Sequence, residues 1–131
     1  MPHNENKRYG SYCFDCNKYR RDLQIYSKIL GMDIITFENG QWKALKFGKH
    51  MINLHQKGKE LEPKAINPIP GSMDICFISY NSLQEVIEHL HINNVKIIED
   101  QILKSGSNGN FESIYIRDPD LNLIEISNYV R

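Results

Sequence analysis

The sequence predicts an α+β fold built from two βαβββ modules, and two observations lead to this prediction. The order strand, helix and three strands occurs twice, once on each side of the proline-containing residues 57–71. The segments also match by residue type, because Ser11–Phe14 aligns with Asp74–Phe77 and Ile52–His55 aligns with Ile124–Ser127. Such self-similarity is typical of a duplicated structural unit.

The length sets the size of the unit that these modules form. A chain of 131 residues, of which 40% are apolar, has enough material for one compact domain. We therefore expect a single domain over 1–131, with internal modules at about 8–56 and 72–129. Two such modules should pair their sheets into a curved half-open barrel, with alternate strand residues lining its concave face.

The elements of the first module follow from hydrophobic spacing. Asn17–Leu30 carries apolar side chains at helical intervals, and Gly31 is a plausible helix end. Asn39-Gly40 is a turn signal between two extended segments. The predicted strands are Tyr9–Asp15, Met32–Phe37, Trp42–Phe47 and Met51–His55.

The second module repeats this order. Ser82, with Glu85 three residues later, has the pattern of a capping box, and the helix that it starts should run to about Asn93. A loop that contains Gly106 and Gly109 is expected after the strand that follows the helix. The predicted strands are Met73–Ser79, Val95–Ile98, Phe111–Arg117 and Leu123–Ser127.

Charge and targeting signals exclude several classes of protein. Lys plus Arg and Asp plus Glu both total 16, so the balanced charge argues against a nucleic-acid binder. No apolar run approaches the roughly 18 residues of a membrane helix, and the polar residues 1–8 lack the core of a signal peptide. We therefore expect a cytoplasmic protein that binds neither nucleic acid nor membrane.

Three cysteines are too few for a disulfide framework, and we expect them to be free thiols. Cys13 and Cys16 form a C-x-x-C pair before a predicted helix, but the flanking pattern is not that of a redox protein. Chance placement of both cysteines is the favoured interpretation.

Two groups of polar residues are candidates for a functional site. Glu125 lies in an otherwise apolar strand, where a buried carboxylate would need a partner or a metal; the alternative is that Glu125 faces solvent. Ser113, Tyr115 and Arg117 are alternate residues of one strand, so they share a face. They could bind a small anion, with the arginine making two hydrogen bonds to a carboxylate or phosphonate group. The alternative for these three is a solvent-facing strand.

The duplicated module, the Asp118-Pro119-Asp120 turn and the strand that contains Glu125 together resemble the vicinal oxygen chelate superfamily. This superfamily includes glyoxalase I, extradiol dioxygenases, and the bleomycin and fosfomycin resistance proteins. Several segments further resemble glyoxalase domain-containing protein 5 and related bacterial glyoxalase-like proteins, over about residues 19–131. These segments are Tyr26–Met32, Lys43–Gly48, Ile52–His55, Glu62–Ala65, Pro70–Ser72, Ser113–Asp120 and Asn122–Tyr129.

The resemblance implies one divalent metal, held from the first and fourth strands of each module. Carried over by position, the residues of the metal site are Ser11, Asn53 or His55, Asp74 and Glu125. Either Asn53 or His55 could reach the site; the expected ligands are His55, Asp74 and Glu125, with Ser11 and Asn53 as substrate contacts. Oxygen and imidazole ligands suit Mn, Fe, Ni or Zn. Glu125 could also act as a catalytic base.

The sequence departs from the family at two positions. Ser11 stands where the first strand usually carries a histidine, and a neutral serine is a poor metal ligand. Leu121 stands where the Asp-Pro-Asp turn usually has glycine, so this turn must be made differently or bear strain.

The resemblance implies metal-dependent lyase, isomerase or dioxygenase chemistry on a small oxygenated and possibly anionic substrate. Tyr115 and Arg117 would orient the anion, and a homodimer is expected. One alternative is a metal-free protein that sequesters small molecules, as bleomycin resistance proteins do, and Ser11 favours it. Another is a fosfomycin-type thiol transferase or epoxide hydrolase, which Ser113 and Tyr115 favour.

Overall fold

The computed structural model describes residues 12–14, 23–37, 42–106 and 109–129. They fall into two units, each built around one four-stranded sheet. The first unit comprises residues 1–73 and 119–122, and the second comprises 74–118 and 123–131.

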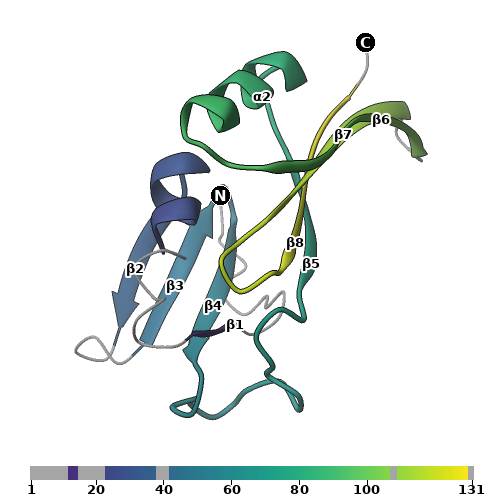
Figure 1. The fold of residues 1–131 in the computed structure, drawn as a ribbon. Coiled ribbons are helices and arrows are strands. Elements are labelled where there is room, and N and C mark those ends of the chain that lie inside the picture. Colours follow the sequence, from purple (N-terminus) through teal and green to yellow (C-terminus); the bar gives the residue numbers. More distant parts are fainter. Residues whose placement is uncertain (1–11, 15–22, 38–41, 107–108, 130–131) are drawn as a thin grey trace. The chain divides into compact units, whose positions relative to one another are not determined.

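The first unit contains a sheet with the order β1-β4-β3-β2. Strand β1 pairs with β4 in parallel, and the other neighbours are antiparallel. Figure 1 shows β2, β3 and β4 side by side, with the short β1 next to β4. The elements are β1 (Tyr12–Phe14), a helical segment η1 (Ile25–Ile29), β2 (Asp33–Phe37), β3 (Trp42–Phe47) and β4 (His50–Gln56).

The first helix is confirmed where the structure describes it. The amide of Leu30 donates to the carbonyl of Ile25 at 3.0 Å, which makes a wide, π-type turn. Tyr26 is fully buried and anchors the segment in the core. Gly31 then ends it with a φ of +74°, as predicted. Residues 15–22 of the predicted helix and strand lie outside the described residues.

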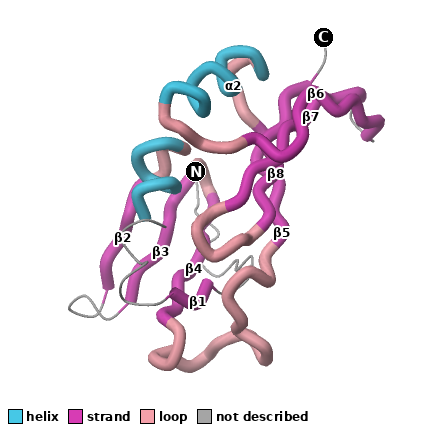
Figure 2. The backbone as a smooth tube through the Cα atoms, in the orientation of Figure 1, coloured by secondary structure: helices cyan, strands magenta, loops and turns pink. Residues whose placement is uncertain are grey.

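The second unit repeats the topology of the first, with the sheet order β5-β8-β7-β6. Strand β5 runs parallel to β8, and β6, β7 and β8 are antiparallel neighbours. Figure 2 shows its strands in magenta and its helix in cyan. The elements are β5 (Asp74–Ile78), α2 (Leu83–Ile92), β6 (Ile97–Gly106), β7 (Gly109–Arg117) and β8 (Leu123–Tyr129).

Alternation along β7 and β8 gives this second sheet one apolar and one polar face. Ile114, Ile116, Ile124 and Ile126 are all buried at 5% exposure or less. Successive strand residues point to opposite faces, so the residues between these isoleucines share the other face. That face carries the polar residues of interest: Ser113, Tyr115 and Arg117 from β7, with Glu125 and Ser127 from β8.

Helix α2 begins where the sequence predicts. The Ser82 hydroxyl accepts a hydrogen bond from the Glu85 amide at 3.2 Å, as an N-cap should. The Glu85 carboxylate accepts a hydrogen bond from the Asn81 side chain at 3.0 Å. Leu83, Ile87 and Leu90 form the buried face of the helix.

The prediction for the second strand of this module is wrong in extent. The strand was expected over Val95–Ile98 with a loop to follow, but β6 runs over Ile97–Gly106 and β7 already begins at Gly109. The β6–β7 register shifts between Ile97 and Glu99, and again between Glu99 and Ile102. Such bulges interrupt the two-residue alternation from which strands are predicted.

The turn before β8 is strained, as the missing glycine predicts. Leu121 has a φ of +69°, in the left-handed region that non-glycine residues avoid. The neighbouring Asn122 is 1% exposed, and its side-chain oxygen accepts a hydrogen bond from the Met73 amide at 2.8 Å. A Cβ atom on Gly71 would lie 2.6 Å from the carbonyl oxygen of Asp120. Residues 69–73 therefore pack tightly against this turn.

Replacing Leu121 by glycine should stabilise the protein. The left-handed conformation costs an L-residue about 1–2 kcal/mol of stability. Glycine removes this cost, but its greater freedom in the unfolded chain lowers the stability by about 0.5–1 kcal/mol. The Leu121 side chain is 65% exposed, so little apolar burial is lost. We expect a net gain of about 0.5–1 kcal/mol in urea unfolding. Leu121→Ala keeps the strain and should give no gain; equal stabilisation by both changes would contradict the strain argument.

Neither helix in the described ranges is long and apolar enough to cross a membrane.

Candidate functional site

Glu125 lies near the middle of the polar face of the second sheet. It is in β8, the strand between β5 and β7, opposite Cys76 on one side and Tyr115 on the other. Its side chain is only 13% exposed. A carboxylate at this depth needs hydrogen-bond partners, since burial of an unpaired charge is costly.

Three hydroxyl groups provide these partners. Ser113 and Ser127 donate to Glu125 Oε2 at 2.7 and 3.0 Å, and Tyr115 donates to Oε1 at 3.1 Å. The two serine oxygens also lie 2.7 Å apart. Hydrogen bonds to a charged acceptor are roughly twice as strong as neutral ones. The hydroxyls therefore hold the carboxylate in a fixed orientation.

Lys104 of β6 completes the cluster with a positive charge. Its Nζ lies 3.5 Å from Glu125 Oε2 and donates a hydrogen bond to the Tyr115 hydroxyl. The same atom lies 4.7 Å from the centroid of the Tyr115 ring, within the range of a cation–π contact. The Glu125 cluster consists of Glu125, Ser113, Tyr115, Ser127 and Lys104.

Cys76 borders the Glu125 cluster from β5. Its sulfur lies 3.3 Å from the Ser127 hydroxyl oxygen, and Cys76 is a free thiol, as predicted. Partial burial of the sulfur raises the pKa of Cys76, and the nearby Glu125 charge also raises it, against a lowering by the Ser127 contact. The thiol is therefore neutral and weakly nucleophilic at neutral pH. Cys16 and the side chain of Cys13 lie outside the described part of the chain.

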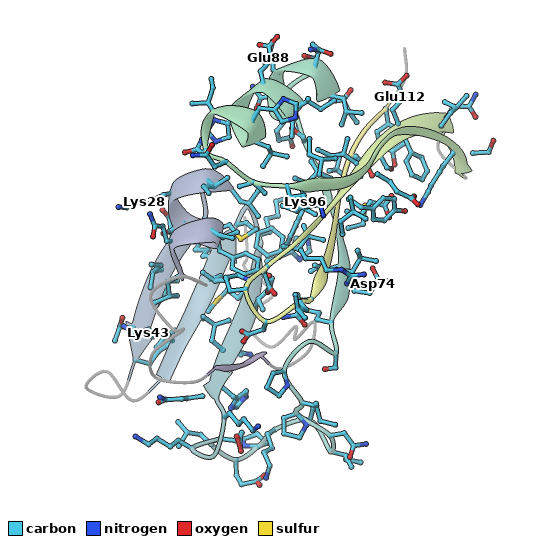
Figure 3. The ribbon with its side chains drawn as sticks, viewed as in Figure 1. Lys28, Lys43, Asp74, Glu88, Lys96 and Glu112 are labelled. Atoms are coloured by element: carbon cyan, nitrogen blue, oxygen red, sulfur yellow. The ribbon has the colours of Figure 1, made fainter. Side chains whose placement is uncertain are left out.

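The other two predicted residues of this face lie at strand ends. Asp74 is the first residue of β5 and Arg117 the last of β7, and both pair with Leu123. Both are exposed. Figure 3 labels Asp74 at the side of β5. Their strand positions place both residues on the same face of the sheet as Glu125.

The remaining predicted residues belong to the first unit. Asn53 and His55 lie on one face of β4, and each is 4% exposed. His55 Nδ1 accepts a hydrogen bond from the Leu61 amide at 3.3 Å, so the neutral ring carries its proton on Nε2. A metal at Nε2 would require the opposite tautomer and the loss of this contact. Ser11 lies outside the described residues.

Lys104 and Ser127 are functional candidates that the sequence did not reveal. Lys104 falls in the segment expected to be a loop, so it was not assigned to any face. Ser127 was recognised only as the end of the last strand. Its position two residues after Glu125 is the signal that could have identified it, because alternate residues share a face.

A metal ion needs several donor atoms that converge on one point. In the parts of the chain that the structure describes, no three His, Cys, Asp or Glu side chains gather closely enough to hold a metal together. Glu125 has the chemistry of a ligand, but its charge is balanced by Lys104. Any metal at Glu125 must therefore compete with this ammonium group.

No family model matches the chain, but curated proteins include relatives of high similarity, two of which follow. The glyoxalase domain-containing protein RDO1 of Mycosarcoma maydis is 45% identical over 114 residues, which are 87% of this chain and 64% of that protein. The virulence protein STM3117 of Salmonella typhimurium is 45% identical over 108 residues, 82% of this chain and 74% of that protein. The chain thus spans less than two thirds of the RDO1 length.

Solved structures agree with these relatives. The crystal structure of STM3117 has a TM-score of 0.84 and 39% identity, covering 99% of this chain and 96% of that one. The lactoylglutathione lyase of Agrobacterium tumefaciens has a TM-score of 0.67 at 22% identity, covering 98% and 96%. The antibiotic binding protein TnmS3 of a Streptomyces species has a TM-score of 0.67 at 15% identity, covering 92% of each chain. The last two likenesses concern the fold alone.

These findings define a chain with an α+β glyoxalase-like fold. It belongs to the glyoxalase/bleomycin resistance/dioxygenase superfamily, which is the vicinal oxygen chelate superfamily that the sequence resembles.

Proposed function

We propose that this protein acts on a small oxygenated, anionic compound at the Glu125 cluster, as a glyoxalase-like lyase, isomerase or dioxygenase. The observation that carries the proposal is a carboxylate, 13% exposed, oriented by three hydroxyls on one face of a sheet. Buried carboxylates with fixed geometry are typical of acid–base sites. The similarity to a glyoxalase domain-containing protein supports the same class of chemistry.

Each residue of this face has its own proposed role. Glu125 would accept a proton from the substrate, and the hydroxyls of Ser113 and Tyr115 would keep its carboxylate oriented. Arg117, exposed at the end of β7, would bind the anionic group of the substrate. Asn53 and Ser11 are proposed substrate contacts from the first module.

The proposed metal is Mn, Fe, Ni or Zn. Glu125, Asp74 and His55 would hold it, and when bound it would stabilise negative charge on a substrate oxygen. The paired modules would form the half-open barrel expected of this fold, in a cytoplasmic homodimer.

The principal alternative is a metal-free binding protein that sequesters a small molecule. The Lys104–Glu125 ion pair favours it, because the carboxylate already has a counter-charge. A fosfomycin-type transferase or epoxide hydrolase is favoured by the placement of Ser113 and Tyr115 beside Glu125. Turnover of an epoxide rather than a hemithioacetal would distinguish this second alternative from a glyoxalase-like reaction.

The experiment that tests the metal assignment is elemental mass spectrometry after incubation of tag-free protein with Mn, Fe, Ni or Zn. Wild-type protein should retain one of them, and Glu125→Gln should reduce the affinity at least tenfold, because the amide keeps the shape of the side chain but loses its charge.

Glu112→Gln is the matched control for Glu125→Gln. Glu112, labelled in Figure 3, lies on β7 next to Ser113, so strand alternation places it on the opposite face and its replacement should leave metal retention unchanged. Equal retention by wild type and Glu125→Gln would exclude Glu125 as a ligand. Retention of none of the four metals would favour the metal-free alternative.

A further inference from the structure

Lys104 is the residue of the Glu125 cluster to which the proposed chemistry gives no role. We propose that its amine forms an imine (a Schiff base) with the carbonyl carbon of a small α-oxo acid, with Glu125 as the base and Tyr115 as the proton donor. This inference rests on the proposed function, because it takes Glu125 to be a group that accepts protons. The electrophile of the reaction is then supplied by the chain itself.

The nucleophile and its base lie next to each other. A lysine attacks a carbonyl only as the neutral amine, so it needs a base within reach. Glu125 Oε2 lies 3.5 Å from Lys104 Nζ, where it can take a proton from the ammonium. The base is held in place by Ser113 and Ser127, which donate to the same carboxylate oxygen at 2.7 and 3.0 Å. A nucleophile, a base and a group that orients the base are the arrangement that covalent catalysis requires.

The Tyr115 hydroxyl is placed to move a second proton. It accepts a hydrogen bond from Lys104 Nζ and donates one to Glu125 Oε1 at 3.1 Å, so it contacts both reacting side chains. Nζ also lies 4.7 Å from the centroid of the Tyr115 ring. A protonated imine carries the same positive charge as the ammonium that it replaces, so this cation–π contact stabilises the product as well.

The protons and bonds of imine formation balance at these three groups. Glu125 takes one proton from the Lys104 ammonium, and the nitrogen lone pair then bonds to the carbonyl carbon. The electron pair of the C=O bond moves to the oxygen, which takes a proton from Tyr115, and Tyr115 recovers a proton from the nitrogen. The nitrogen then forms the C=N bond as the C–O bond breaks, and the oxygen leaves as water with the proton that Glu125 held.

Access and charge indicate the class of substrate. The Lys104 side chain is 35% exposed, so a small molecule can reach its amine from solvent. Arg117 is exposed and lies two residues beyond Tyr115 on the same face of β7, about 7 Å along the strand. A guanidinium group binds a carboxylate through two hydrogen bonds. A compound with a carboxylate next to its carbonyl carbon can therefore react at Lys104 while Arg117 binds its charge.

The imine also connects Lys104 to the proposed role of Glu125. A protonated imine withdraws electrons from the carbon next to it, so a hydrogen on that carbon is more acidic than in the free α-oxo acid. Glu125 is ionised again once the water has left, and it can accept this hydrogen as a proton. Proton abstraction at Glu125 should therefore depend on Lys104.

The test is reductive trapping in the full chain, with pyruvate as the probe. Sodium cyanoborohydride supplies a hydride that adds to the imine carbon and leaves a stable secondary amine. Peptide mass spectrometry should find the adduct on Lys104, formed faster than on any other lysine and saturating with the pyruvate concentration. Lactate has a hydroxyl group in place of the carbonyl and should give no adduct.

Four variants locate the reaction. Lys104→Arg keeps the positive charge beside Glu125 and should lose the rapid adduct. Glu125→Gln and Tyr115→Phe each remove one proton-transfer group and should slow trapping about tenfold or more; the second covers the case that the first fails to fold. Lys96→Arg is the matched control, because Lys96 is an exposed lysine of the same unit (Figure 3), and trapping at Lys104 should be unchanged. Thermal unfolding checks that each variant is folded.

The outcomes separate this inference from the proposed function. Trapping that is equally slow at all exposed lysines would overturn the imine, and so would a Lys104 adduct that forms at the wild-type rate in both Glu125→Gln and Tyr115→Phe. Proton NMR in heavy water measures exchange of the pyruvate methyl hydrogens, which should require both Lys104 and Glu125. Trapping without this exchange would support the imine but overturn Glu125 as the base that acts on substrate. Metal retention that depends on Glu125, with no trapping at Lys104, would overturn the imine and leave the proposed function standing.

Discussion

Replacing Gly71 by alanine is expected to lower the free energy of unfolding by about 2–4 kcal/mol, in two roughly equal parts. The first part is conformational, because Gly71 has a φ of +78° that alanine adopts only at a cost. The second part is steric, because the new Cβ would lie 2.6 Å from the backbone oxygen of Asp120. Backbone atoms cannot rotate away, so the turn itself must shift.

Gly58→Ala separates these two parts. Gly58 has a similar φ of +83°, but nothing lies within 4 Å of a Cβ built there. It should therefore show only the conformational loss of about 1–2 kcal/mol. Urea unfolding of both variants measures the difference. Equal losses would mean that the contact between Gly71 and the turn does not contribute to stability.

Asn122→Ala should cost about 1–3 kcal/mol, because it leaves the Met73 amide without its acceptor. The hydrogen bond is 2.8 Å long, and both residues are buried. The side chain that is removed also leaves a small cavity, since Asn122 is 1% exposed. Chemical denaturation, followed by circular dichroism, measures the loss.

The control for Asn122 is Asn67→Ala, in the loop that the turn supports. Asn67 is exposed, so its replacement should change the free energy of unfolding by no more than about 0.5 kcal/mol. The loop between β4 and β5 also includes Leu61, whose amide contacts His55. A change in the NMR chemical shift of the Leu61 amide in Asn122→Ala would show that the turn supports this contact. A loss as small as that of Asn67→Ala would contradict a structural role for the Met73 hydrogen bond.

Much of the fold could be predicted from local signals in the sequence. Gly31 and Ser82 mark helix ends by their own chemistry, and Trp42–Phe47 is a short, largely apolar run that follows a turn signal, so each could be predicted correctly. The extent of β6 could not, because its bulges break the alternation. The strand was therefore placed too early and made too short.

The candidate site was predicted less completely, for a related reason. Glu125, Ser113 and Tyr115 lie on regular strands, so their shared face follows from counting by two. The partner that balances the charge of Glu125 lies on the irregular strand. The sequence also left open whether Glu125 faces solvent, and the burial of its side chain answers that question for the second unit.

The position of β8 within its sheet has a kinetic consequence. Strand β8 lies between β5 and β7, and its parallel pairing joins Asp74 to Leu123, two residues far apart in the chain. Contacts between distant residues form slowly, because closing a long loop costs entropy before the contacts compensate for it. The β6–β7 hairpin is local and can form early. The β7–β8 hairpin is local as well, because one short turn joins Arg117 to Leu123. Glu125 can therefore gain its Ser113 and Tyr115 donors early, and the slow step is the parallel docking of β5, which brings Cys76 beside the cluster.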